Sequence, residues 1–156
     1  MRARLPLIAL SALLLAACSS GPVKRVSPPQ ASISQLTVLA DGQWQLELRL
    51  QNFSTMAMRF DSVNLELRNE QELLARLDAQ PAFNVGPESG DLHRLTVQPT
   101  AQGRQLAAAT LADGRALPYQ LSGTLQASPD NGRPRDYPIT YRSTLHPAPG
   151  LPGVLR

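Results

Sequence analysis

Cysteine is almost absent from the chain, since Cys18 is the only one among 156 residues. A single cysteine cannot form an internal disulfide, and it cannot supply the cysteine pairs of a thiolate zinc site. Histidine is nearly as scarce, with two residues, and no His-x-x-x-His or Glu-x-x-His spacing occurs. We therefore expect no metal and no cofactor.

Clustered positive charge is also missing, although the chain has 15 basic and 12 acidic residues. Arg2 and Arg4 lie close to the first residue, and the other basic residues are scattered. No basic run could track a phosphate backbone, so we expect no nucleic-acid partner. Aromatic residues make up only 4% of the chain, and Trp44 falls on an alternating apolar face, which favours a core position over a sugar-binding one.

Residue groups that support catalysis are hard to find in this sequence. Residues 86–90 (Gly-Pro-Glu-Ser-Gly) differ from the Gly-x-Ser-x-Gly nucleophile elbow because the serine is displaced by one position, and a turn is the better interpretation. The acidic pairs Glu70/Glu72 and Asp130/Asp136 fall in or beside predicted turns, where solvated carboxylates are expected rather than an acid–base dyad. We therefore expect that the protein is not an enzyme.

A long apolar run is present at residues 5–17, directly after Arg2 and Arg4. At about 1.5 Å per residue, this run would span roughly 20 Å as a helix, short of the roughly 30 Å hydrocarbon core of a bilayer. Positive charge, a short apolar stretch and small residues before a cysteine are typical of a secretory signal peptide. We assign residues 1–17 to a signal peptide.

The end of this segment, Leu15-Ala16-Ala17-Cys18, resembles the lipobox of bacterial lipoproteins. The resemblance implies cleavage between Ala17 and Cys18, transfer of a diacylglyceryl group to the Cys18 sulfur, and acylation of the new amino group. Three acyl chains anchor a protein stably, whereas one chain binds only marginally. The signal that retains lipoproteins in the inner membrane has Asp directly after the cysteine, whereas this chain has Ser19 there. We therefore expect anchoring in the outer membrane, facing the periplasm. The alternatives are a buried thiol and an ordinary signal peptide with a coincidental cysteine.

Alternation of apolar and polar residues dominates the rest of the chain. In residues 43–51, Trp44 and three leucines occupy every second position, which predicts a strand with one buried face. The parity of the apolar residues changes near Asp61 and Ser62, which predicts a bulge that restores the inward face. An Asp-Gly pair at residues 41–42 and Asp-Asn-Gly at residues 130–132 predict turns.

Residues 69–80 fit two patterns. Leu73, Leu74 and Leu77 suit a helical stripe, whereas Leu73, Ala75 and Leu77 suit a strand. We favour a strand that follows a turn at residues 69–70.

The strand count and the turn residues together predict an all-β fold. We expect an antiparallel β-sandwich of about seven strands (immunoglobulin- or fibronectin-like), with one short helix at residues 103–111. We assign residues 18–31, which are rich in Pro, Gly and Ser, to a lipidated flexible tether. Residues 32–145 then form the sandwich, and residues 146–156 form a Pro/Gly-rich tail.

Residues 46–67 resemble the type 2 late embryogenesis abundant family, also called the WHy (water-stress and hypersensitive-response) domain. That family has an amphipathic strand that ends in Asn-Pro-Asn and is followed by a second alternating strand. Here Asn52 matches the first Asn, while Phe53 and Ser54 stand in place of the Pro and the second Asn. Residues 119–125 match the closing strand of the family, with its glycine among alternating apolar residues.

The resemblance implies a seven-stranded sandwich with a short helix, no enzymatic chemistry, and a role in desiccation and other stress through protection of other proteins. We therefore expect an anchored lipoprotein that protects envelope components, with the membrane and envelope client proteins as partners. The alternative is an adaptor module whose sheet face or edge recruits one envelope protein, although Pro138 would blunt the last predicted strand. For Asn52, the pattern favours a side chain that closes the strand-end turn.

Replacement of Cys18 by Ala should abolish the incorporation of radiolabelled palmitate, because the cysteine provides both acylation sites. Labelling of the immunoprecipitated protein measures this, with Ser19→Ala as a matched control that keeps the cysteine. Equal labelling of the wild type and Cys18→Ala would contradict the lipobox assignment.

Overall fold

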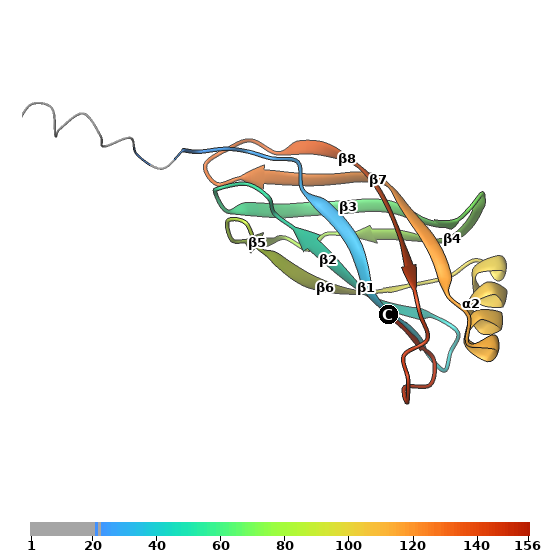
Figure 1. Ribbon diagram of the computed structural model, residues 1–156. Helices are drawn as coiled ribbons and strands as arrows, with labels where there is room; N and C mark the ends of the chain where they lie inside the picture. Colours follow the sequence, from blue (N-terminus) through green and yellow to red (C-terminus); the bar gives the residue numbers. More distant parts are fainter. Residues whose placement is uncertain (1–20, 22) are drawn as a thin grey trace, which may run out of the picture.

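The computed structural model describes Gly21 and residues 23–156, so the predicted signal peptide, Ala17 and Cys18 lie outside the described residues. In the described part, nine strands form two antiparallel sheets that face each other, and one helix, α2 (Ala101–Asp113), lies across one end (Figure 1). The chain is thus an all-β sandwich with one short helix, as the alternation predicts. Two of the nine strands, of three and two residues, account for the excess over seven.

Each sheet is built from neighbouring antiparallel pairs. The first has the order β6-β2-β1-β9, with bounds Gly90–Val97, Trp44–Gln51, Gln30–Val38 and Val154–Leu155. The second has the order β4-β3-β7-β8, with bounds Glu72–Ala79, Met58–Asn69, Leu117–Pro129 and Arg135–Leu145. The short strand β5 (Phe83–Val85) pairs with the beginning of β3.

The alternating residues of β2 supply the centre of the core. Trp44, Leu46, Leu48 and Leu50 have no exposed surface, while the residues between them point away from the second sheet. Burial of each such side chain contributes roughly 1.5–3 kcal/mol, so this strand supplies a large share of the hydrophobic stabilisation.

Bulges correct the alternation where the sequence breaks it. The register of β3 against β7 shifts between Phe60 and Ser62, and both Phe60 and Val63 are buried, so the predicted bulge is confirmed. In β4, Leu74 and Ala75 are both buried, and the register against β3 shifts opposite them. The strand interpretation of residues 69–80 is therefore confirmed, and the extra buried leucine that suggested a helix is the bulge residue.

The helix α2 extends the predicted residues 103–111 by two at each end and packs on β4. Thr100 caps its first turn, because the Thr100 hydroxyl accepts from the Gly103 N–H at 3.0 Å and donates to the Leu73 carbonyl at 2.8 Å. A Cβ at Gly103 would collide with the Leu74 backbone, so the glycine permits the close approach of helix and strand.

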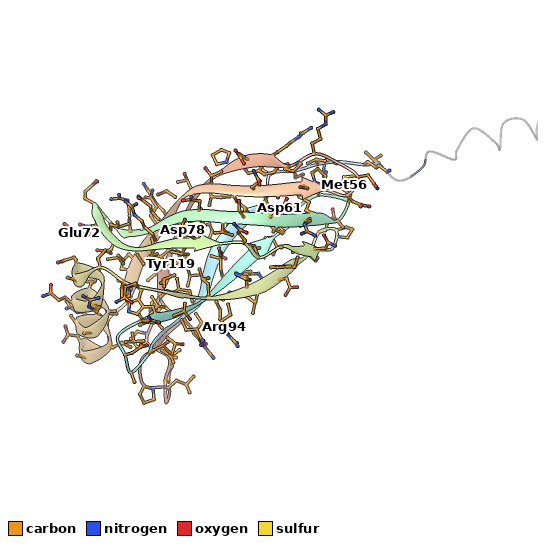
Figure 2. All side chains as sticks on the ribbon, turned by 180° about the vertical axis from the view of Figure 1, so that it is seen from behind. Met56, Asp61, Glu72, Asp78, Arg94 and Tyr119 are labelled. Carbon is orange, nitrogen blue, oxygen red and sulfur yellow. The ribbon has the colours of Figure 1, made fainter. Side chains whose placement is uncertain are left out.

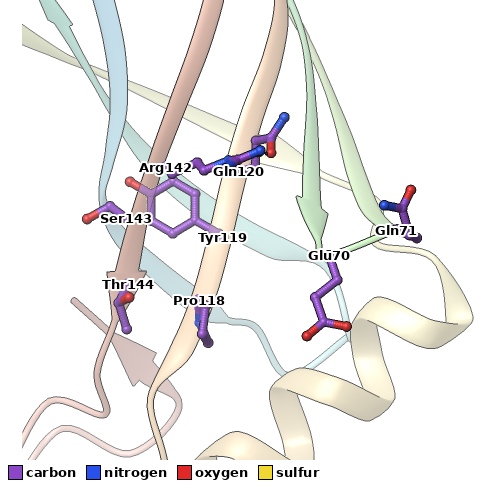
Figure 3. Close-up of a pocket in the computed structure, with 8 residues that line it drawn as sticks. All are labelled: Glu70, Gln71, Pro118, Tyr119, Gln120, Arg142, Ser143 and Thr144. Carbon is purple, nitrogen blue, oxygen red and sulfur yellow. Dashed lines mark hydrogen bonds between the residues drawn. The ribbon is translucent and has the colours of Figure 1, made fainter.

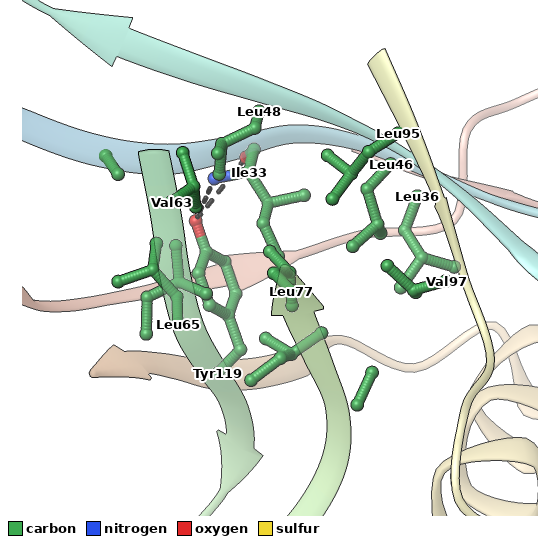
Figure 4. Packing of buried hydrophobic residues seen from close by; sticks show 14 of the residues in the cluster. Ile33, Leu36, Leu46, Leu48, Val63, Leu65, Leu77, Leu95, Val97 and Tyr119 are labelled. Atoms are coloured by element: carbon green, nitrogen blue, oxygen red, sulfur yellow. Dashed lines mark hydrogen bonds between the residues drawn. The ribbon is translucent and has the colours of Figure 1, made fainter. Parts of the chain in front are cut away.

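Tyr119 connects the two sheets through the core (Figure 4). Its ring lies on β7 among buried aliphatic side chains, and its hydroxyl reaches β1, where the Ile33 N–H donates to it at 3.0 Å. The register of β1 shifts between Ile33 and Gln35, so the hydroxyl satisfies a backbone group that the ladder leaves free.

The two ends of the fold differ from the predicted boundaries. Strand β1 begins at Gln30 and Ala31 is fully buried, so the folded part begins inside the segment assigned to the tether. Strand β9 lies in the segment assigned to the tail, pairs with β1, and buries Leu155 completely. Proline and glycine at residues 147–153 exclude a helix, but they leave room for a two-residue edge strand.

Gly123→Ala should lower the free energy of unfolding by about 2 kcal/mol, because Gly123 has φ +146° and an added Cβ would collide with the Asn64 carbonyl on β3. Denaturant unfolding of the purified protein measures this. The adjacent Ser122→Ala is the control and should change the unfolding free energy by less than about 0.5 kcal/mol. Equal midpoints for the two variants would contradict the packing described for β3 and β7.

Candidate functional site

Three loops meet at the end of the sandwich where the chain enters the fold (Figure 1). They are residues 52–57 between β2 and β3, residues 86–89 between β5 and β6, and residues 130–134 between β7 and β8. Met56 of the first loop lies at the opposite end of the molecule from α2 (Figure 2). We call these three loops, together with residues 23–27, the loop end.

Backbone hydrogen bonds join the loops to one another. The Glu88 N–H donates to the Ser54 carbonyl at 3.0 Å, and the Asp130 N–H donates to the Ala57 carbonyl at 2.9 Å. The second and third loops are therefore both held against the first.

The side chain of Asn52 organises the loop end from inside. Asn52 is fully buried, and its amide nitrogen donates to the carbonyls of Met56 and Gly86, both at 2.8 Å, and of Val85 at 3.2 Å. Its amide oxygen accepts from the Ser54 N–H at 2.8 Å. Both polar atoms of the amide form hydrogen bonds, so the side chain closes the turn after β2 and ties it to β5.

Ser54 and Thr55 hold the segment that precedes β1. The Ser54 hydroxyl accepts from the Ser27 N–H at 2.9 Å and lies 3.2 Å from the Ser27 carbonyl, to which it can donate. The Thr55 hydroxyl accepts from the Arg25 N–H at 2.8 Å and donates to the Val23 carbonyl at 2.7 Å. The Thr55 N–H donates to the Arg25 carbonyl at 3.0 Å. Residues 23–27 are therefore bonded to the first loop.

Phe53 lies in the sequence between the buried residues Asn52 and Ser54, and its own side chain is 44% exposed. Elsewhere in the loop end, the Arg25 guanidinium and the Glu88 carboxylate approach to 3.7 Å, with both side chains mostly exposed. Such a pair contributes at most about 1 kcal/mol. The order of the loop end thus comes from its hydrogen bonds, and Phe53 is left at the surface.

The sequence singled out Asn52, Phe53 and Ser54, and the structure places all three in the first loop. Thr55 and residues 23–27 were not singled out. A Ser-Thr pair after a strand-ending Asn is a usable signal, because hydroxyls there commonly bond to backbone. Nothing local indicates that their partners lie about thirty residues earlier in the chain.

A surface hollow of 520 Å³ lies between the β3–β4 turn and strands β7 and β8 (Figure 3). Glu70, Gln120 and Arg142 line it, and the Arg142 Nε donates to the Gln120 Oε1 at 2.8 Å. Burial raises the pKa of the Tyr119 phenol, an effect that its hydrogen bond to Ile33 opposes. The phenol is therefore engaged within the fold, while the exposed Arg142 guanidinium can still form hydrogen bonds at the rim of the hollow.

The two histidines lie on different elements. His93 is on β6 and stacks on Phe83 with ring centroids 6.0 Å apart, while the His146 carbonyl accepts from the Arg156 N–H at 2.8 Å near β9. Among Gly21 and residues 23–156, no group of three His, Cys, Asp or Glu side chains could hold a metal ion.

In the same part of the chain, no helix has the length and hydropathy that a membrane crossing requires.

Ser89, Glu70 and Asp136, the serine and carboxylates that were candidates for catalysis, lie on different loops and strands. The Ser89 hydroxyl donates to the Gly86 carbonyl at 2.8 Å within the second loop. Asp136 accepts from the Gln126 amide at 3.0 Å across β7 and β8, and Glu70 lies in the β3–β4 turn with φ +51°. Trp44 is fully buried, which confirms its predicted core position.

No protein-family model matches the chain, and no curated protein matches it. A crystal structure of a protein from Archaeoglobus fulgidus is similar, with 10% identity and a TM-score of 0.45 over 80% of this chain and 98% of that one. A candidate ApaA protein from Bordetella pertussis has 14% identity and a TM-score of 0.47 over 83% of this chain and 100% of that one.

A solution structure of a candidate late embryogenesis abundant (LEA) protein is also similar, with 13% identity and a TM-score of 0.47. The match covers 91% of this chain and 80% of that one. The name of that solved structure contains the words late embryogenesis abundant, without a type.

Asn52→Ala should lower the free energy of unfolding by about 3 kcal/mol, because it removes the partner of the buried Val85 carbonyl, of two part-buried carbonyls and of the buried Ser54 N–H. Denaturant unfolding measures the loss. Asn84→Ala is the matched control, since Asn84 is exposed on β5, and it should change the unfolding free energy by less than about 0.5 kcal/mol. A loss for Asn52→Ala as small as that of the control would contradict the organising role of this amide.

Proposed function

We propose that this chain is a lipid-anchored lipoprotein of the bacterial envelope whose non-enzymatic sandwich protects envelope components under desiccation or other stress. The anchor is the acylated Cys18, formed after cleavage behind Ala17, in the outer membrane and facing the periplasm. The partners are the membrane, reached through the lipid, and envelope proteins that act as clients.

The observation that carries this proposal is the bonding of residues 23–27 to the loop of Asn52, Phe53 and Ser54. These three residues occupy the positions of the Asn-Pro-Asn motif of the late embryogenesis abundant family, and Asn52 matches its first Asn. The family motif and the segment that leads to the lipobox cysteine thus belong to one structural unit. This supports a domain that is held at the membrane by its loop end.

The outer face of the second sheet supplies a surface for weak contacts with clients. A shallow hollow of 590 Å³ lies there around Gly123. It is lined by polar side chains of β3 and β7, namely Ser62, Asn64, Glu66, Ser122 and Thr124. When water is withdrawn, such groups can form hydrogen bonds to the polar surface of another protein, which would otherwise lose its hydration partners.

A strain that lacks the gene should survive drying and osmotic shift less well than its parent, and the wild-type gene should restore survival. Cys18→Ala should fail to restore it, because the unanchored protein is no longer concentrated at the envelope. Ser19→Ala, which keeps the cysteine, is the matched control, and immunoblots show that all variants are produced. Survival of the deletion strain equal to that of its parent would contradict the protective role.

Recruitment of a single partner is the competing function, and crosslinking in cells separates the two. Protection predicts many clients at low occupancy, whereas recruitment predicts one stoichiometric partner. The edge strand β8 argues against strand addition there, because Pro138 in its middle removes one backbone donor. Recovery of one stoichiometric partner by mass spectrometry would favour the adaptor function over protection.

A further inference from the structure

Exposed apolar side chains gather at the loop end. In the described part of the chain, five large apolar side chains are exposed, and three of them belong to the loop end. These are Val23, Val26 and Phe53, which are 77%, 40% and 44% exposed. The other two, Leu92 on β6 and Leu151 near β9, belong to other parts of the fold. Single exposed apolar residues that are scattered over a surface need no explanation, but three such residues in the loop end do.

These three side chains are held by the hydrogen bonds of the loop end. The Val23 carbonyl accepts from the Thr55 hydroxyl, and Val26 lies between two residues whose N–H groups bond to Thr55 and Ser54. Phe53 lies between the buried Asn52 and Ser54. The three exposed apolar side chains thus belong to two segments that hydrogen bonds join into one unit.

The charge of the loop end has a small positive excess. Its charged residues are Lys24, Arg25 and Arg133 on the basic side and Glu88 and Asp130 on the acidic side. Arg25 and Glu88 pair with each other, while Lys24, Arg133 and the acidic Asp130 form no ion pair with another described residue. Two basic side chains are therefore available to a negatively charged partner.

The short length of chain between Cys18 and Val23 indicates which partner covers the loop end. Four residues separate Cys18 from Val23, and a chain of that length spans at most about 18 Å. Strand β7, with 13 residues, is roughly 40 Å long. With a lipid on Cys18, the loop end must lie beside the bilayer, whereas the α2 end can lie well away from it.

We infer that Val23, Val26 and Phe53 form a docking surface for the lipid bilayer that carries the anchor. The three apolar side chains enter the headgroup region, and Lys24 and Arg133 contact lipid phosphates. This inference rests on the proposed lipid anchor. Docking directs the sandwich away from the membrane and leaves both outer sheet faces accessible to clients.

The test uses the acylated full-length protein in vesicles of phosphatidylcholine and phosphatidylglycerol that contain a nitroxide-labelled lipid. Because acylation consumes Cys18, an introduced cysteine is the one free thiol and can carry a fluorophore. Pro134→Cys places the fluorophore in the third loop, and Ala112→Cys places it on α2 at the far end. Lipid quenching should be strong for the first fluorophore and weak for the second.

Removal of the apolar side chains separates docking from simple proximity to the anchor. The pair Val23→Ser and Phe53→Ser should lower the ratio of docked to undocked protein by about tenfold or more, seen as a loss of quenching at residue 134. Leu92→Ser with Leu151→Ser is the matched control and should leave the quenching unchanged. Lys24→Gln should lower the docked ratio about fivefold in vesicles with phosphatidylglycerol and little in phosphatidylcholine alone.

Several results would overturn the inference. Quenching at residue 134 that survives both serine substitutions would show that the short link alone brings the loop end near the lipid. Weak quenching with strong energy transfer between labelled copies would place a second copy of the chain on this surface. As a control, the serine variants should have the same unfolding midpoints as the wild type, which excludes misfolding as the cause of any loss of quenching. Mass spectrometry that finds Cys18 without acyl groups would instead overturn the proposed anchor.

Discussion

The buried amide of Asn52 is the interaction on which one whole end of this sandwich depends. It accepts from the Ser54 N–H and donates to carbonyls of its own loop and of β5, so it fixes two loops at once. Ser54, fully buried beside it, and Thr55 then present their hydroxyls to residues 23–27. Because buried polar groups need partners, the correct placement of each loop requires that of the others.

Much of the sandwich could be predicted because its strands obey a local rule. Alternation identified β2, and the change of parity near Asp61 identified the bulge in β3. Leu74 shows where that rule becomes ambiguous, since a bulge residue adds an apolar side chain that imitates a helical stripe. Strand β9 was missed, because a two-residue strand among prolines and glycines has no period to detect.

The candidate site was predictable in one part only. Asn52 could be recognised, because an Asn at the end of an alternating strand is suited to close a turn. The partners of Ser54 and Thr55 could not be found, because their contacts join residues that lie far apart in the sequence. The same reason explains why residues 23–27 looked like a tether. They lie within a segment rich in Pro, Gly and Ser, and only the contacts with the first loop show their place in the fold.

The central claim is that residues 23–27 belong to the folded domain and are held there by the loop of Asn52. Amide hydrogen exchange of the purified protein tests it most directly, at the Arg25 and Ser27 N–H groups. The account predicts exchange far slower than in an unfolded chain, and a return to rapid exchange in Asn52→Ala while amides of β2 stay protected. Rapid exchange at Arg25 and Ser27 in the wild-type protein would contradict it.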